Sequence, residues 1–394
     1  MKKAISILLA LIFILASTAS LAGCSKSPLD KIKSTKQELT AVGSAGGYEI
    51  LYEEIRCLTL GFKERMEWTY GDDIWKTNES SEKYREQLED YVLYALTVNA
   101  AALKVAADNG IKPDDKEVEE YVELKIAEQA SELAQNLKIQ NSDDNYSPSR
   151  KEINEAYEKF LAENHLTDNY YRYVLTIDAC IEILKQKLVE KGTLSSNDDV
   201  ITDYINENFV RTVHVYVPFE NDGDYQIAKD KAELVHWILS NNFKFDSRQA
   251  ELKEKLGINA YTDPDSSTVK FFNRIVDATD ENEKMKVLIG SVYNKDMTIS
   301  QNGYYFSYGE FEKSYEEAAM NTAINGISDP VLTETGFYII QRLELDGNYI
   351  FTNLDTLKSQ YHMAYINKLI DEAQANIKFE FNDYGKTLDL TKMQ

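Results

Sequence analysis

The hydrophobic pattern of this chain changes its period near Phe209. Along residues 48–206, apolar residues recur every three or four positions, which is the spacing of amphipathic helices. Along residues 212–217, polar and apolar residues alternate strictly, which is typical of a strand. Helices and strands of these two kinds bury their apolar sides in different ways, so the sequence predicts an α+β fold.

The helical part carries recognisable start and stop signals. Residues 84–108 predict one helix that stops at Asn109-Gly110, and Ser149 with Glu152 predicts a capping box that opens another. A later helix has one apolar stripe, for which burial in a core and a partner-binding face are the two interpretations: Val174, Ile177, Ile181, Leu184 and Leu188. Single helices of this kind cannot bury themselves, so we expect a helical domain.

The remainder of the chain mixes short strands with helices. Residues 225–240, 283–293 and 311–321 predict helices, while residues 303–308 and 336–345 predict strands, and residues 241–282 show no regular pattern. This order predicts a small antiparallel sheet with helices. Residues 352–376 predict a final amphipathic helix, which is followed by an alternation at Ile377, Phe379 and Phe381.

The charge of the chain limits its partners. Among 394 residues, 66 acidic side chains outweigh 43 basic ones, for a net charge of -23. Without the two lysines of an N-terminal segment that we expect to be removed, the charge is 41 - 66 = -25. So acidic a chain disfavours nucleic acid as a partner, and it disfavours a polybasic grip on anionic lipid.

The N-terminal segment supplies another route to a membrane. Met1-Lys2-Lys3 precedes an apolar stretch at residues 5–16 that is too short to span a bilayer, and Leu21-Ala22-Gly23-Cys24 follows. This tetrad resembles a bacterial lipobox. The resemblance implies a signal peptide at residues 1–23, acylation of Cys24, and a lipid-anchored protein on the extracytoplasmic face of the bacterial cell membrane. The polar residues 24–47 then predict a tether.

No cofactor or metal is expected from the residue spacing. His165, His236 and His362 lack metal-ligand spacing, and the acidic stretch at residues 263–281 lacks the ordered pattern of a calcium loop. Cys57 and Cys180 are too few for a disulfide framework; they are free buried thiols or a single pair, and we favour free thiols.

Residues 301–343 carry a specific resemblance. Phe306-Ser307-Tyr308-Gly309, Gly326-Ile327-Ser328 and Gly336-Phe337-Tyr338-Ile339-Ile340 stand among ordered motifs that are similar to the C-terminal half of parvulin-type peptidyl-prolyl isomerases. Residues 210–217 are similar to the opening strand of that family, and residues 293–296 to a segment beside its histidine. The resemblance implies an isomerase domain at residues 207–348.

The arrangement along the whole chain resembles extracytoplasmic foldases of the PrsA and SurA kind. In that family a helical chaperone domain, assembled from both ends of the chain, carries an inserted parvulin domain. The likeness implies a SurA-like helical domain at residues 48–206 and a C-terminal segment at residues 349–394 that packs on it. It also implies unfolded or partly folded secreted polypeptides as partners, and it leaves a homodimer open.

The same resemblance assigns site residues. His214, Asp296 and Thr335 correspond to a polar cluster, and the proline slot corresponds to aromatic side chains at Phe306, Phe311 and Tyr315. Tyr338 stands where the family usually has a second histidine. A phenol can donate and accept a hydrogen bond but does not titrate near neutral pH, so we expect weakened isomerase activity.

Three functions are compatible with these residues. The first is a foldase that binds unfolded chains and isomerises X–Pro bonds. The second is a non-catalytic chaperone or assembly factor whose degenerate parvulin domain only binds peptide. The third is a substrate-binding lipoprotein of a transporter, which the long helical first half opposes because such proteins need alternating strand–helix units.

Overall fold

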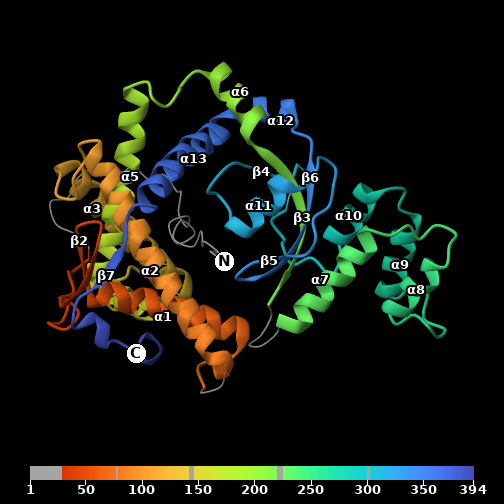
Figure 1. The fold of residues 1–394 in the computed structure, drawn as a ribbon, viewed down its shortest axis with the longest axis horizontal. Coiled ribbons are helices and arrows are strands. Elements are labelled where there is room, and N and C mark those ends of the chain that lie inside the picture. The colour runs from red at the N-terminus through yellow and green to blue at the C-terminus, as the bar shows by residue number, and fades with distance from the viewer. Residues whose placement is uncertain (1–28, 77–78, 142–145, 220–224, 300–301) are drawn as a thin grey trace. The chain divides into compact units, whose positions relative to one another are not determined.

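The computed structural model describes residues 29–76, 79–141, 146–219, 225–299 and 302–394. It confirms the predicted α+β class, with small antiparallel sheets among many helices. The chain divides into two compact units (Figure 1). Of the described residues, unit 1 comprises 29–64, 75–76, 79–141, 146–196 and 365–394, and unit 2 comprises 65–74, 197–219, 225–299 and 302–364. In the described parts of the chain, no helix is both long and apolar enough to cross a membrane.

Unit 1 is built on long helices. Its helices are α2 (Glu79–Asp108), α3 (Lys116–Gln140), α4 (Arg150–Glu163) and α5 (Asp168–Glu190), together with the first part of α1 (Tyr52–Tyr70) and the second part of α13 (Leu354–Gln374). Helix α3 packs against both α4 and α5. The predicted capping box at Ser149 and Glu152 is present at the start of α4. Cys57 and Cys180 are buried and free, as expected.

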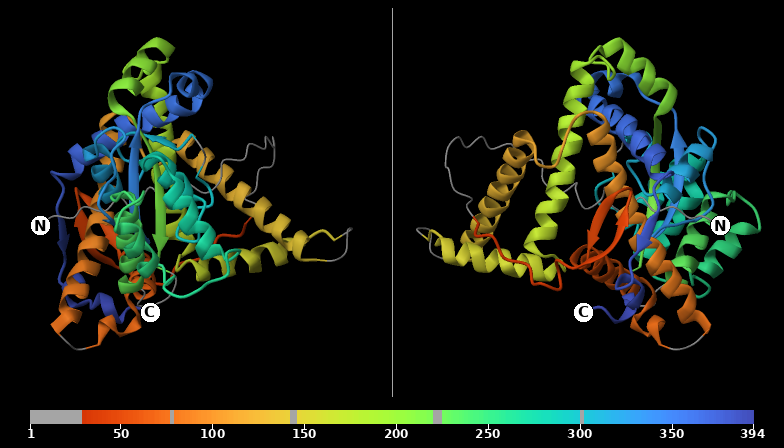
Figure 2. Two further views of the ribbon diagram at one scale, coloured as in Figure 1. Left: turned by 90° about the vertical axis from the view of Figure 1, so that its right-hand side faces the viewer. Right: turned by 60° about the vertical axis from the view of Figure 1, so that its left-hand side comes forward.

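Unit 1 also contains a three-stranded sheet of order β2-β1-β7. Strands β1 (Ala41–Ala45) and β2 (Tyr48–Leu51) form a hairpin, and β7 (Phe379–Phe381) pairs with the other side of β1, so that Gly43 lies opposite Phe381. The blue β7 lies beside the red hairpin in Figures 1 and 2. Short 3₁₀ turns follow β7: η2 (Gly385–Thr387) and η3 (Leu390–Lys392). The predicted tether, residues 24–47, therefore contains strand β1. With only five residues, this strand is too short to show a clear alternation.

Unit 2 is built on a four-stranded antiparallel sheet of order β4-β3-β6-β5. The strands are β3 (Val210–Pro218), β4 (Tyr304–Phe306), β5 (Val331–Leu332) and β6 (Gly336–Leu343). Gly303 directly precedes β4 and has φ +72°, and a Cβ atom there would lie 2.3 Å from the Thr212 carbonyl oxygen. Glycine therefore permits β4 to approach β3 closely.

The side chains of β3 alternate between the two faces of the sheet, and helices cover both faces. Val213, Val215 and Val217 join a core with α7 (Tyr225–Leu239) and α10 (Glu281–Ile289). The other face of the sheet packs on α11 (Lys313–Asn321) through Tyr315 and Ala319, so α7 and α11 lie on opposite sides of β3 (Figure 1). Both faces are buried, which makes His214 a buried residue.

Further short helices complete unit 2: η1 (Asp72–Trp75), α6 (Asp198–Asn208), α8 (Arg248–Lys255), α9 (Ser267–Asp277) and α12 (Gly347–Thr352). Helices α8 and α9 lie in the stretch where the sequence shows no regular pattern. Helix α8 has only eight residues, whereas α9 carries apolar residues at helical spacing that were not recognised as a helix from the sequence: Val269, Phe272, Ile275 and Val276. At the N-cap of α9, the Ser266 side chain accepts from the Val269 amide.

Candidate functional site

His214 lies at the centre of a hydrogen-bonded cluster in unit 2. Its side chain is 2% exposed. Its Nε2 atom lies 2.9 Å from Asp296 Oδ2, and its Nδ1 atom lies 2.9 Å from the Tyr315 hydroxyl. An ionised carboxylate only accepts, so Nε2 carries a proton and donates it to Asp296. In the neutral imidazole, Nδ1 then accepts from Tyr315, whose oxygen in turn accepts from Thr212 Oγ1 at 2.8 Å.

Asp296 is held as an anion beside this imidazole. Its Oδ2 atom accepts from the Tyr304 hydroxyl at 2.6 Å, and its Oδ1 atom accepts from the Thr298 amide at 2.8 Å and the Thr298 hydroxyl at 2.6 Å. Partial burial raises the pKa of Asp296, but the hydrogen bonds from His214, Thr298 and Tyr304 outweigh burial and lower that pKa below its usual range.

The loop that carries Asp296 is fixed to β3. The buried Asn294 side chain accepts from the Tyr216 amide at 2.9 Å and donates to the Asp296 carbonyl at 2.9 Å. The Lys295 amide donates to the Tyr216 carbonyl at 2.9 Å. These bonds set the position of Asp296 opposite His214 although the loop has no regular secondary structure.

Aromatic rings enclose the imidazole. Tyr304 stacks on it with ring centroids 5.3 Å apart, and Tyr338 and Tyr315 meet it edge-on at 4.8 Å and 5.5 Å. Tyr216 stacks on Tyr338 at 4.5 Å. Burial raises the pKa of both Tyr315 and Tyr338, so their hydroxyl groups stay protonated and can donate at neutral pH.

The other expected site residues surround this cluster. Phe311 stacks on Tyr315 at 4.9 Å and lies 4.6 Å from the Phe306 ring. Tyr315 and Phe306 are at most 1% exposed, so they support the surface, whereas Phe311 and Tyr338 are partly exposed and belong to it. Exposed Thr335 accepts from the Tyr216 hydroxyl through its carbonyl at 3.1 Å. Cys24 lies outside the described residues.

Sequence reasoning missed several members of the cluster. Tyr304, Thr298 and Thr212 contact the expected residues directly. Two signals could have indicated them: Thr212 stands two positions before His214 and so shares its face of the strand, and Tyr304 stands two positions before Phe306. Thr298 gave no such signal because it lies in a loop. Among the described residues, no group of three or more His, Cys, Asp or Glu is arranged to hold a metal ion.

A buried carboxylate holds the loop that presents Phe311. Glu316 is 4% exposed, and its Oε1 atom accepts from the amides of Glu310 at 2.7 Å and Phe311 at 2.8 Å. Its Oε2 atom accepts from the Gly309 amide at 3.0 Å. One side chain thus fixes three successive amides of this loop.

Two more carboxyl groups near this loop should make the stability of unit 2 depend on pH. Burial raises the pKa of Glu310 to about 7, opposed by bonds from Ser307 and Gln360, and burial raises the pKa of Glu334 to about 7, opposed by Arg65. Between the unfolded pKa of about 4.3 and these values, the folded state binds more protons. The free energy of unfolding should therefore fall as pH rises from about 5 to 8, by on the order of 1 kcal/mol or more per group.

Urea unfolding at several pH values checks this expectation. Glu310→Gln should flatten the decrease, because the amide does not titrate, whereas Glu317→Gln on the exposed side of α11 should leave the pH dependence unchanged. The two variants also separate this effect from general repulsion within an acidic chain. A wild-type free energy that increases across this interval would contradict the assignment.

Comparisons with known proteins find similar chains among solved structures, at low sequence identity. No family model matches the chain, and no curated protein matches it. Among solved structures, PrsA from Bacillus subtilis is 19% identical, with 75% of this chain and 86% of that chain covered and a TM-score of 0.22. Foldase protein PrsA from Streptococcus pneumoniae is 13% identical, with 88% and 97% covered and a TM-score of 0.27. Peptidylprolyl isomerase (PrsA) from Bacillus anthracis is 17% identical, with 73% and 99% covered and a TM-score of 0.23.

All three neighbours are PrsA proteins, and the likeness extends over 73% to 88% of this chain. With TM-scores this low, the likeness transfers no residue role to this chain. What the site can do follows from its own groups: a neutral hydrogen-bond donor in Tyr338, an imidazole held from both nitrogens, and a partly exposed aromatic ring in Phe311.

Proposed function

We propose that this protein is a membrane-anchored extracytoplasmic foldase that binds unfolded secreted polypeptides and isomerises X–Pro peptide bonds. The observation that carries the proposal is the arrangement of His214 between Asp296 and Tyr315, within an aromatic cluster whose partly exposed members include Phe311 and Tyr338. The anchor is the predicted acyl group on Cys24.

The chemistry requires positioning rather than a nucleophile. The barrier to rotation about an X–Pro bond is amide resonance, and uncatalysed exchange takes tens to hundreds of seconds. A catalyst must favour the twisted amide over either planar form. Phe311 offers an apolar contact for the proline ring, and the Tyr338 hydroxyl offers a donor to the polarised amide. The Asp296–His214–Tyr315 chain keeps the surrounding rings in fixed positions.

A protease-coupled assay on proline-containing peptides tests the proposal. The chain should increase the isomerisation rate above the uncatalysed rate, but less than a parvulin with two histidines does. The same preparation should reduce aggregation of an unfolded secreted protein. A chain that changes neither rate nor aggregation is not a foldase.

Tyr338→His should raise kcat/KM about tenfold. The replacement puts an imidazole beside His214 in place of the phenol, and unlike the phenol an imidazole can be protonated near neutral pH. A charged donor makes a hydrogen bond to the twisted amide that is stronger by about 1.4 kcal/mol, which corresponds to that factor. The matched control is Tyr349→His, which makes the same change at a ring that stacks on Tyr305. The same peptide assay measures both variants. An unchanged or lower rate in Tyr338→His would show that the missing histidine does not limit activity.

A non-catalytic chaperone is the second candidate function. The near-complete burial of His214 favours it, since a side chain that is 2% exposed does not contact a bound peptide in this conformation. Under this alternative, the wild-type chain suppresses aggregation without any acceleration of isomerisation. Measuring both quantities on one sample therefore separates the two functions.

A further inference from the structure

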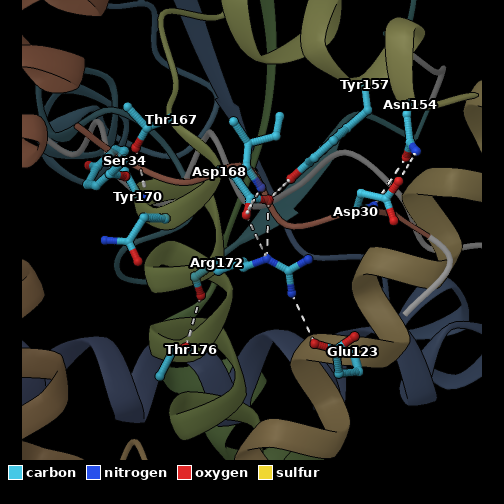
Figure 3. A network of polar contacts seen from close by, with 12 residues as sticks. Asp30, Ser34, Glu123, Asn154, Tyr157, Thr167, Asp168, Tyr170, Arg172 and Thr176 are labelled. Atoms are coloured by element: carbon cyan, nitrogen blue, oxygen red, sulfur yellow. Dashed lines mark hydrogen bonds and ion pairs between the residues drawn. The ribbon is translucent and has the colours of Figure 1, made fainter. Parts of the chain in front are cut away.

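The chain is fixed to unit 1 from the first residue that the structure describes. Leu29 is 1% exposed, and the Asp30 amide donates to Asn154 Oδ1 at 3.2 Å (Figure 3). The Asp30 carboxylate accepts from Arg150 at 2.5 Å and from Asn154 at 2.6 Å. Both partners lie on α4. The segment therefore does not begin as a free tether.

Two buried acidic residues continue this attachment. The Ile32 amide donates to Asp168 Oδ2 at 3.2 Å, and the Ser34 hydroxyl donates to Glu53 Oε2 at 2.9 Å. Asp168 is 4% exposed and Glu53 is fully buried. Figure 3 shows Asp168 at the centre of its own network, where it accepts from the Tyr157 hydroxyl at 2.7 Å and pairs with Arg172 at 3.2 Å. The segment is thus attached to side chains that are themselves fixed.

The length of chain before Leu29 limits how far unit 1 can lie from the anchor. Five residue steps separate Cys24 from Leu29, and a fully extended chain covers at most about 18 Å in five steps. Helix α5, by contrast, is about 33 Å long from Asp168 to Glu190. If Cys24 carries the lipid, as the proposed function requires, the Asp168 end of unit 1 is held near the bilayer.

The charges of this segment are opposite to those of the chain as a whole. Lys31, Lys33 and Lys36 are exposed, and Asp30, the one acidic residue of residues 29–37, is paired with Arg150. Lysines close to an anionic membrane surface are attracted to it. A chain with a net charge of -23 therefore presents a local positive surface next to its expected anchor.

We propose that residues 29–37, fixed on α4 and α5, form a membrane-facing surface of unit 1 that contacts anionic lipid headgroups through Lys31, Lys33 and Lys36. This surface sets which end of the helical unit faces the bilayer. The electrostatic contact that the overall charge disfavours is thereby made locally, with the lipid on Cys24 as the main attachment.

Energy transfer from the protein to labelled vesicles tests this surface. The acylated full chain, purified from membranes of an expressing bacterium, carries a donor dye at Gln37→Cys or at Glu190→Cys, both exposed positions, and the native Cys57 and Cys180 are buried. The vesicles contain phosphatidylglycerol and phosphatidylcholine with an acceptor on their headgroups. Transfer should be several-fold stronger from position 37 than from position 190.

Charge reversal separates the effect of the three lysines from that of the lipid anchor. Replacing Lys31, Lys33 and Lys36 by glutamate should lower energy transfer from position 37. Vesicles of phosphatidylcholine alone should lower it as well. The control reverses the same number of exposed lysines, Lys112, Lys116 and Lys191, which lie near the C-terminal end of α5, where Lys187 donates to the Gly110 carbonyl. The control should leave transfer unchanged.

The outcomes distinguish this surface from the anchor. A chain that floats with the vesicles but shows equal transfer from both positions overturns the membrane-facing surface and leaves the foldase proposal intact. Equal effects of the two triple reversals overturn the role of these lysines. A chain that does not float, even with Cys24 intact, overturns the anchor and this surface together.

Discussion

Glu316→Ala is expected to lower the free energy of unfolding of unit 2 by about 3–5 kcal/mol. A hydrogen bond to a charged group is worth about 1.5–3 kcal/mol, and the Glu316 carboxylate accepts three of them from successive amides. Alanine leaves these amides without that acceptor, and water reaches the partly buried loop only in part. A loss of this size is a large fraction of the stability of a typical domain.

Urea unfolding measures the loss, and hydrogen exchange at the amides of Gly309, Glu310 and Phe311 localises it. Exchange at these three positions should accelerate by a larger factor than elsewhere in unit 2. Glu317→Ala is the matched control, because its exposed side chain makes a surface ion pair with Lys313 at 3.9 Å, an interaction that contributes little to stability. Glu316→Gln keeps one oxygen acceptor and should give an intermediate loss. A change below 1 kcal/mol in the alanine variant would show that the loop does not depend on this carboxylate.

His214→Phe is expected to lower the isomerase kcat/KM by about 100-fold, because this buried side chain positions the groups around it and a misplacement of about 1 Å in a site can cost that factor. Phenylalanine fills a similar volume and keeps the ring contacts with Tyr304 and Tyr338. It removes the donor to Asp296 and the acceptor for Tyr315. The expected loss therefore reports the polar contacts rather than a cavity.

The matched control is His236→Phe, in which the same change is made on α7 at a side chain that is 30% exposed and pairs with Asp329 at 3.5 Å. Its activity should equal that of the wild type. Aggregation suppression should survive in both variants, since client binding does not require the imidazole. Full isomerase activity in His214→Phe would remove this residue from the proposed site.

Local patterns in the sequence were sufficient for much of the fold. The alternation at residues 212–217 predicted β3, which extends over Val210–Pro218, and the helical spacing at residues 84–108 predicted most of α2. Ser149 and Glu152 form the expected capping box. Each of these signals lies within a few residues of the element that it predicts, so no knowledge of distant contacts was needed.

Elements that depend on distant partners could not be predicted in the same way. Strand β1 has five residues, and its register is set by pairing with β2 and β7 rather than by its own pattern. In the site, the family resemblance indicated His214 and Asp296. Tyr304 and Thr298 donate to Asp296 because the loop that carries Asp296 folds against β3. Such contacts depend on loop geometry, which residue type alone does not determine.

The pairing of β1 with β7 has a consequence for the order in which the chain can fold. Gly43 of β1 pairs with Phe381 of β7, so the sheet of unit 1 lacks its third strand until residues 379–381 have been synthesised. Every strand of unit 2 lies between these two positions. During vectorial synthesis or export, unit 2 can complete its sheet while unit 1, whose segments flank it in the sequence, still exposes the open edge of β1. For a protein proposed to assist the folding of others, the early part of its own chain would be the last to close.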